Sequence, residues 1–183
     1  MSALSPRVVK EFCKLCDWTF QVWLNHRELF DENPRAVELQ KSMGAETLAR
    51  LNTISQEYTL LQIAKLHDPS VVSGQITLGI EYIVKYGGWD QQLLEKLSGL
   101  ADQLNEFARG LRSVRNKALS HNDLAAILSS SVLGEFEKGE DVKYFHVLQE
   151  LVDLVHSEVI GGPSPFDDLV KNDVVALMAI IKP

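Results

Sequence analysis

Apolar residues recur every three or four positions along most of the chain, which is the spacing of one face of an α-helix. The first stripe follows Ser5-Pro6, a pair that can cap and begin a helix. It stops before the turn sequence at 31–34, so we expect the first helix to end near Phe30. A second stripe lies beside the first, so this helix should contact more than one neighbour, one of which could be another subunit. The two stripes are Val8, Phe12, Leu15, Thr19, Val22 and His26, and Val9, Cys13, Cys16, Phe20 and Trp23.

The same periodicity predicts further helices up to residue 86. Gly44 is expected to separate a short helical piece over 35–43 from a long helix over 45–66. The sequence His67-Asp68-Pro69 should end the long helix, because the residue before a proline avoids the helical region. Residues 69–75 are expected to form a loop. The spacing favours a helix over 76–86, although its β-branched residues leave a strand open.

The second half of the chain continues as helices and turns. A helical pattern begins at Trp89-Asp90, and after Ser98-Gly99 it resumes as far as Val114. A polar loop over 129–141 precedes an amphipathic helix over 142–160, and a last helix is expected over 172–181. The result is one all-α domain over residues 1–183, a bundle of about six helices. Leu104, Phe107, Leu111, Leu148, Leu151 and Val155 should be buried against one another.

Composition fits this architecture. Hydrophobic residues make up 45% of the 183 residues and charged residues 23%, which is ordinary for a soluble globular protein. A chain of this length can bury a core without a metal ion or a disulfide. No apolar run reaches about 18 residues and no hydrophobic signal segment opens the chain, so we expect no membrane span and a cytoplasmic location. No cofactor or metal ion is expected.

Two cysteines, Cys13 and Cys16, have the spacing C-x-x-C. Zinc would need about two more ligands nearby, and the chain has no second cysteine pair. A redox motif of this kind follows a strand, whereas the flanking pattern is helical. We therefore expect two small buried residues one helical turn apart.

The remaining histidines and the tryptophans show no pattern of a site. The histidines at 26, 67, 146 and 156 are scattered and lack ligand spacing. His67, beside Asp68-Pro69, is expected to be a helix terminus. Trp18, Trp23 and Trp89 are expected to be anchors in the core or in an interface.

The charge of the chain is unevenly distributed. Its formal net charge is −7, with 18 Lys and Arg against 25 Asp and Glu, which argues against nonspecific coating of nucleic acid. Between Glu106 and Asp123, however, every charged residue is a cation. A positive block in an acidic chain predicts a local site for a phosphate, and we favour a phosphate of RNA. Its cations are Arg109, Arg112, Arg115 and Lys117.

Within this basic stretch, Arg115 and Asn116 are followed after four residues by His121. Histidine titrates near neutral pH and suits proton transfer. Arginine presents a planar, permanent charge that suits phosphate, and Asn116 can bind a phosphate oxygen or hold the imidazole tautomer. These are the groups needed to cut RNA without a metal ion. The alternative is structural, since an Arg and a His near a helix end often satisfy the terminal carbonyls.

Helix geometry separates these two side chains. On one unbroken helix, Arg115 and His121 would lie about 120° apart and about 9 Å apart along the axis. Either the helix breaks between them, as the polar run 120–123 allows, or a partner chain completes the site.

The run RNKALSHND at 115–123, on the penultimate long helix expected of an all-α chain, resembles the motif of the HEPN superfamily. Together with L-H-D-P at 66–69, it is most similar to the AbiU-type branch linked to abortive infection. This resemblance implies a helical homodimer whose two motifs meet at the interface, and a metal-independent endoribonuclease acting as a toxin or in phage defence. It implies catalytic roles for Arg115, Asn116 and His121, RNA or phosphate binding by Arg109, Arg112 and Lys117, and an antitoxin or other protein as a further partner. Some members bind RNA, nucleotides or proteins without cutting, which remains the alternative.

Overall fold

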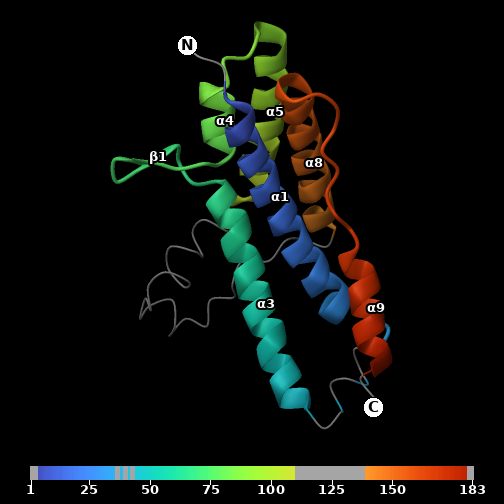
Figure 1. Cartoon of the computed structure of the whole chain (residues 1–183). Coiled ribbons are helices and arrows are strands. Elements are labelled where there is room, and N and C mark those ends of the chain that lie inside the picture. Colours follow the sequence, from blue (N-terminus) through green and yellow to red (C-terminus); the bar gives the residue numbers. More distant parts are fainter. Residues whose placement is uncertain (1–3, 36–37, 39–40, 42–43, 110–138, 181–183) are drawn as a thin grey trace.

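The computed structural model describes residues 4–35, 38, 41, 44–109 and 139–180, and within them the chain is mostly helical (Figure 1). The predicted all-α bundle is therefore confirmed. The described helices are α1 (Pro6–His26), the π-helical turn η1 (Arg27–Asp31), α3 (Ala45–Leu66), α4 (Ile80–Tyr86), α5 (Gln91–Phe107), α8 (Glu140–Val159) and α9 (Val170–Ile180).

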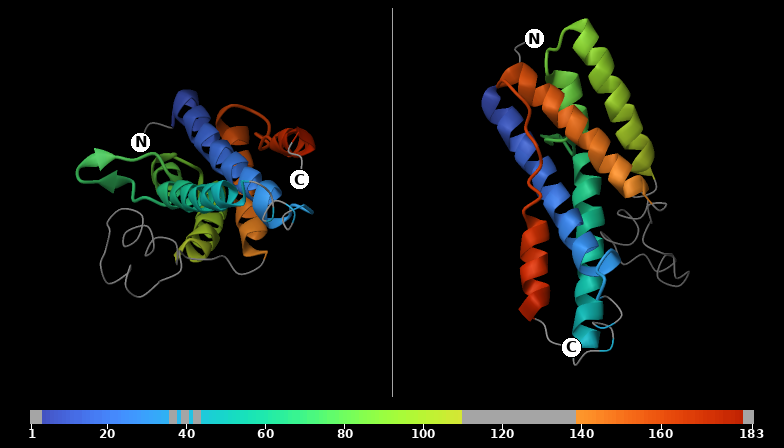
Figure 2. Two further views of the ribbon diagram at one scale, coloured as in Figure 1. Left: turned by 90° about the horizontal axis from the view of Figure 1, so that it is seen from below. Right: turned by 90° about the vertical axis from the view of Figure 1, so that its right-hand side faces the viewer.

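Helix α1 contacts several of the other helices. It packs against α3, α8 and α9, while α5 packs on α8 and α4 on α5 (Figure 2). The Ser5 hydroxyl accepts a hydrogen bond from the Val8 N–H at 3.4 Å and caps the helix, as the sequence predicts. The wide apolar arc of α1 explains its several neighbours, since Phe12 and Cys16 are completely buried on it.

The predicted core between α5 and α8 is largely confirmed. Leu104, Leu148, Leu151 and Val155 are fully buried. Phe107 lies at the edge of this core and is only partly buried, with its ring 6.4 Å from the ring of Tyr144 in an edge-on arrangement. The sixth predicted core residue, Leu111, lies outside the described residues.

The two cysteines are free and buried on α1, as predicted. Burial raises the pKa of the Cys13 thiol to about 11 and the pKa of the Cys16 thiol well above its usual value. Neither thiol is therefore ionised near neutral pH, and the thiolate is the reactive form of cysteine. Their place in the core accounts for the C-x-x-C spacing without a redox or metal role.

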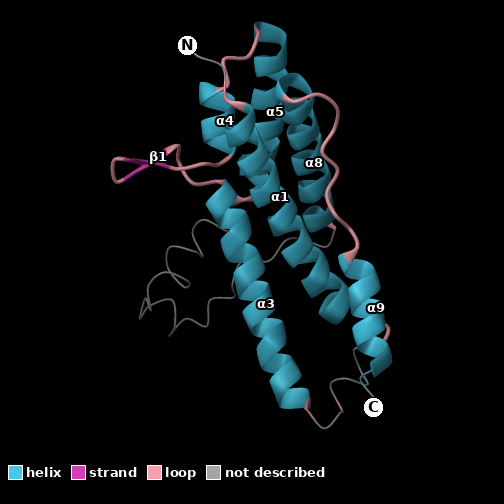
Figure 3. Ribbon diagram, viewed as in Figure 1, coloured by secondary structure: helices cyan, strands magenta, loops and turns pink. Residues whose placement is uncertain are grey.

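The helix expected over 76–86 is wrong at its start. Residues 71–76 form a small hairpin of β1 (Val71–Val72) and β2 (Gln75–Ile76), in which Val71 pairs with Ile76 (Figure 3). Ser73 and Gly74 close it with φ values of 50° and 80°, the left-handed conformation that two-residue hairpin turns require. Helix α4 starts only at Ile80. A Cβ on the preceding Gly79 would lie 2.8 Å from the Leu66 carbonyl oxygen, so the chain needs glycine at this corner.

The turn between α4 and α5 gives a matched test of local packing. A Cβ at Gly87 would overlap the indole of Trp89, whose Nε1–H donates to the Ile83 carbonyl at 3.0 Å. We expect Gly87→Ala to cost about 1–3 kcal/mol, because the ring must leave its place. Gly99, by contrast, lies within the continuous helix α5, and a Cβ there meets nothing within 4 Å.

Gly99→Ala should stabilise the protein by roughly 0.5–1 kcal/mol, because alanine loses less backbone entropy in a helix. Thermal melting measures both changes, with about 2–4 °C expected per kcal/mol in a chain of this size. Equal shifts of the same sign for the Gly87 and Gly99 variants would contradict the packing described for Trp89.

Residues 161–169 join α8 to α9 as an extended strap held by side chains. Gln149 on α8 donates to the Ser164 carbonyl at 2.9 Å and accepts from the Phe166 N–H at 2.7 Å. The Ser164 N–H donates to Asp153 at 2.8 Å, also on α8. The Phe166 ring stacks on Phe20 of α1, with centroids 5.0 Å apart. These contacts give hydrogen-bond partners to backbone groups of the strap, which lie outside any helix or sheet. They also direct the chain towards the C-terminal end of α1.

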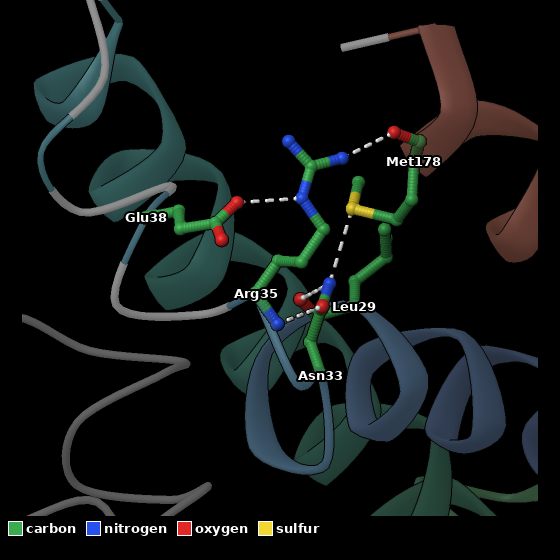
Figure 4. A network of polar contacts seen from close by, with 5 residues as sticks. All are labelled: Leu29, Asn33, Arg35, Glu38 and Met178. Atoms are coloured by element: carbon green, nitrogen blue, oxygen red, sulfur yellow. Dashed lines mark hydrogen bonds and ion pairs between the residues drawn. The ribbon is translucent and has the colours of Figure 1, made fainter. Parts of the chain in front are cut away.

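The C-terminal end of α9 is held by the turn that follows η1 (Figure 4). The Arg35 guanidinium donates to the Met178 carbonyl at 2.6 Å and to Glu38 at 2.7 Å. Asn33 is buried and donates to the Leu29 carbonyl at 3.0 Å and to the Met178 sulfur at 3.1 Å. A cation on one of the last carbonyls of a helix also opposes the negative end of its dipole. This network fixes α9 against the end of α1.

Candidate functional site

Most of the predicted site belongs to one segment of the sequence. Arg112, Arg115, Asn116, Lys117 and His121 lie within residues 110–138, outside the described part of the chain. Their roles therefore stay predictions. The described structure gives the first residue of the basic stretch, Arg109, and the two helix ends between which the segment lies.

Arg109 follows the last turn of α5, and its side chain is exposed. Its guanidinium forms an ion pair with Glu106, one turn earlier in the chain. An exposed pair of this kind contributes only about 0.2–1 kcal/mol. A phosphate could replace Glu106 as the partner at little cost, but the paired state is also what a purely structural role of Arg109 predicts.

The two helix ends that flank the segment lie together. Helix α5 ends at Phe107 and α8 begins at Glu140, and the two helices pack side by side (Figure 1). Tyr144, in the second turn of α8, is fully buried, and its ring lies edge-on to Phe107. On the other side of α8, Asp141 accepts a hydrogen bond from the Trp23 indole of α1 at 3.0 Å. The helix ends that flank residues 110–138 are thus packed in the core rather than free.

His67 joins these two helix ends to a third. It is the C-terminal cap residue of α3 and is only 3% exposed. Its Nδ1 lies 3.0 Å from Asn105 Oδ1 in the last turn of α5, and its Nε2 lies 2.9 Å from the Tyr144 hydroxyl in α8. We call these three residues the His67 tie. It holds the ends of α3, α5 and α8 in register with one another.

An amide oxygen only accepts, so His67 Nδ1–H donates to Asn105. In the neutral tautomer that this bond selects, Nε2 accepts from the Tyr144 hydroxyl. Burial raises the pKa of Tyr144 well above its usual value, so the phenol keeps the proton that it donates. A nearly inaccessible imidazole with both nitrogens engaged suits positioning rather than contact with a substrate.

The sequence places His67 correctly at a helix terminus but does not indicate the His67 tie. Its partners are 38 and 77 positions away along the chain. The one available signal is the L-H-D-P run, in which Leu66 and His67 are both buried. A histidine is rarely needed for a helix end alone, so its presence there indicates a buried hydrogen-bond partner.

His26 is a second buried histidine and has a different environment. Its Nε2 lies 3.5 Å from Asp31, and its Nδ1 is buried with no hydrogen-bond partner among the described residues. Burial lowers the pKa of His26, and the nearby Asp31 carboxylate partly opposes this shift. The ring is therefore neutral near pH 7, which does not suit it to bind phosphate.

In the part of the chain that the structure describes, no three His, Cys, Asp or Glu side chains are grouped so as to hold a metal ion. The described helices also include none that is long and apolar enough to cross a membrane.

A comparison with protein families gives a match over nearly the whole chain. The model of the HEPN family AbiU2 matches residues 7–177, a range that includes both the His67 tie and the basic stretch. No protein of curated function and no solved structure matches. A match of this extent agrees with the resemblance carried by L-H-D-P and RNKALSHND, and the chain belongs to the AbiU2 family of HEPN proteins.

Proposed function

We propose that this HEPN protein is a metal-independent endoribonuclease that acts in phage defence or as a toxin. The observation that carries the proposal is the Arg115-Asn116-x4-His121 spacing inside a chain whose family match runs from residue 7 to 177. The acidic remainder of the chain supports it as well, because a cationic stretch in such a background is a defined place for a phosphate.

The proposed reaction needs only side chains and the RNA itself. His121 removes the proton from a ribose 2′-hydroxyl, and the freed oxygen attacks the neighbouring phosphorus. The bond from phosphorus to the 5′ oxygen breaks, and that oxygen takes up a proton from water while His121 returns its own proton to the solvent. A 2′,3′-cyclic phosphate and a 5′-hydroxyl end remain. Arg115 stabilises the charge that develops on the phosphate oxygens, and Asn116 orients either the phosphate or the imidazole.

The site is proposed to form in a homodimer. Arg115 and His121 would diverge on one helix, and two basic stretches that meet across a twofold axis would bring an Arg and a His to one phosphate. The remaining cations, Arg109, Arg112 and Lys117, would bind the flanking phosphates. Binding at these positions should weaken as the salt concentration rises.

The second candidate function is a noncatalytic HEPN dimer that binds RNA, a nucleotide or a partner protein such as an antitoxin. The pairing of Arg109 with Glu106 favours its protein-binding form, because a cation that the chain neutralises itself is less available to a phosphate. The two candidates share a fold and a family and differ in whether RNA is cut.

Incubation of the purified protein with RNA in the presence of EDTA separates them. A ribonuclease of the proposed kind should produce fragments with 2′,3′-cyclic phosphate ends at the same rate with and without the chelator. A noncatalytic dimer should bind RNA and leave it intact. Cleavage that EDTA abolishes would count against both candidates and against the reaction written above.

A further inference from the structure

Helices α1 and α3 together expose an apolar strip along the seam between them. On α1, Leu15 and Trp18 point outward one turn apart and are 42% and 48% exposed. On α3, Leu51, Ile54 and Tyr58 follow at the spacing of one helix face and are 49%, 59% and 40% exposed. The Trp18 indole and the Tyr58 hydroxyl lie 3.4 Å apart and join the two rows. We call these five residues the α1–α3 strip.

A pocket of about 330 Å³ opens at one end of the strip. Leu29 and Phe30 form one wall, and α9 contributes Leu177 and Met178. This last wall is fixed, because Arg35 and Asn33 both hold Met178 (Figure 4). Leu177 and Ile180 extend the apolar surface along α9 and are 45% and 76% exposed. The α3 wall of the pocket comprises Leu48, Leu51, Ile54, Ser55 and Tyr58.

Charge is sparse on the α3 and α9 parts of this surface, while on α1 the exposed Glu11–Lys14 ion pair borders Leu15 and Trp18. On α3, Glu57 is the one charged residue between Arg50 and Lys65, and on α9 no charged residue occurs from Val174 to Ile180. Depletion of charge over a fully covered centre is the compositional sign of a protein interface. Isolated exposed apolar residues are ordinary, but two aligned rows and an adjoining pocket form a continuous patch.

The area of this patch suits a dimer of standard size. The α1–α3 strip, Leu177 and Ile180 make seven large apolar residues, each between 40% and 76% exposed. A large side chain can bury on the order of 150–200 Å², so seven that are about half exposed offer roughly 500–700 Å². A standard interface covers about 800 Å² per partner, which a polar rim around this patch would supply.

We propose that a second copy of this chain docks on the α1–α3 strip, with α1 and α3 of the two copies forming a four-helix layer around a twofold axis. A twofold interface uses the same patch on both partners, so the patch must supply both projections and hollows. This surface does so, because the half-exposed Trp18 lies against Tyr58, and Tyr58 and Ile54 line the adjoining pocket. The inference builds on the proposed homodimer but does not depend on RNA cleavage.

The test places one charge in the strip and measures the mass in solution. Ile54→Lys should weaken dimerisation by about 30-fold or more, because a lysine would be buried without a partner at the centre of the interface. Light scattering and sedimentation at micromolar protein should then give a dimer for the wild type and a monomer for the variant. Ile76→Lys is the matched control, since Ile76 is 72% exposed on the hairpin away from the strip. That control should remain a dimer.

A second variant keeps the test decisive if Ile54→Lys disturbs α3. Leu15→Lys lies on α1 and should also yield a monomer with unchanged helical content and melting temperature. A monomeric wild type, or a dimer that survives both substitutions, overturns the proposal. RNA cleavage is measured separately on the same samples. If the wild type cleaves no RNA and these substitutions still convert it from dimer to monomer, the interface proposal holds and the ribonuclease proposal is rejected.

Discussion

Replacement of His121 by alanine should reduce RNA cleavage by a factor of about 10² to 10⁴ and leave the fold intact, and Arg115→Ala should do the same. The expected loss is that of a proton-transfer group or of a donor to the developing charge. The measurement is the initial rate of cleavage at saturating RNA, together with thermal melting. Controls of the same residue types are His146→Ala and Arg50→Ala, since both side chains are exposed on α8 and α3, far along the chain from the basic stretch.

A mixture of the two inactive variants tests how the site is assembled. A mixed dimer of Arg115→Ala and His121→Ala keeps one intact Arg115 on one chain and one intact His121 on the other. These two side chains can act together only across the interface, so recovered activity would support a composite site. Different tags on the two variants would confirm that subunits have exchanged.

Recovered activity and continued inactivity of the mixed dimers do not bear equally on the composite site. If both residues must come from one chain, every mixed dimer is inactive. A cleft that needs both copies of His121 would also give an inactive mixture, so rescue supports the composite site more strongly than its absence rejects it. Full activity of either single variant would falsify the catalytic assignment and return Arg115 and His121 to a structural role at a helix end.

Leu148→Ala should lower the free energy of unfolding by about 2–5 kcal/mol. Leu148 is completely buried between α8 and α5, so the substitution loses the transfer free energy of the side chain and leaves a cavity. Unfolding in urea measures the change from the midpoint and slope of the transition. Val142→Ala on the same helix is the control. Its side chain is exposed, and it should change stability by less than about 0.5 kcal/mol.

A Leu148 variant as stable as the wild type would mean that α8 does not present this face to α5. Both positions gain alanine within the same helix, but valine is a poorer helix former than leucine, so propensity alone separates the two variants by roughly 0.5 kcal/mol. A difference of about 2 kcal/mol or more between the two variants therefore reports packing.

The periodicity of the sequence predicts the long helices well because each buries a continuous stripe. The predicted ends of α1, α3 and α8 agree with the structure to within a few residues. Ser98-Gly99 is the exception, since α5 runs through it without a break. A single glycine costs a helix only about 1 kcal/mol, which the burial of Leu97, Leu100 and Leu104 on the same helix offsets.

Short elements were harder to predict because their stabilising contacts are remote. Residues 76–79 have the spacing of a helix and the β-branched content of a strand, and the turn at Ser73-Gly74 decides in favour of the hairpin. Trp18 and Leu15 also carry no signal of their exposure, since they lie at helical spacing beside buried residues of α1. Periodicity shows that a face is apolar, but it does not show what covers that face.

The candidate site divides in the same way. The basic stretch is visible in the sequence because charge sign and residue type are local properties, and it lies within the range of the family match. The hydrogen bonds of the His67 tie are not visible, because they connect residues from three separate helices. Residue type and spacing thus predict the groups suited to the chemistry, and the structure shows the residues that hold the neighbouring helix ends.

The attachment of α9 implies that the chain does not open as one unit. Val174 is the one buried residue among the described residues of α9, and the helix is held mainly by the strap and by the contacts of Met178. Its amides should therefore exchange with solvent through local opening, at a free energy well below that of global unfolding. Because the proposed dimer covers Leu177 and Ile180, association would suppress the local unfolding of α9 by mass action. Protection of α9 would then rise with protein concentration, and so would that of α5–α8 core amides that exchange only through global unfolding.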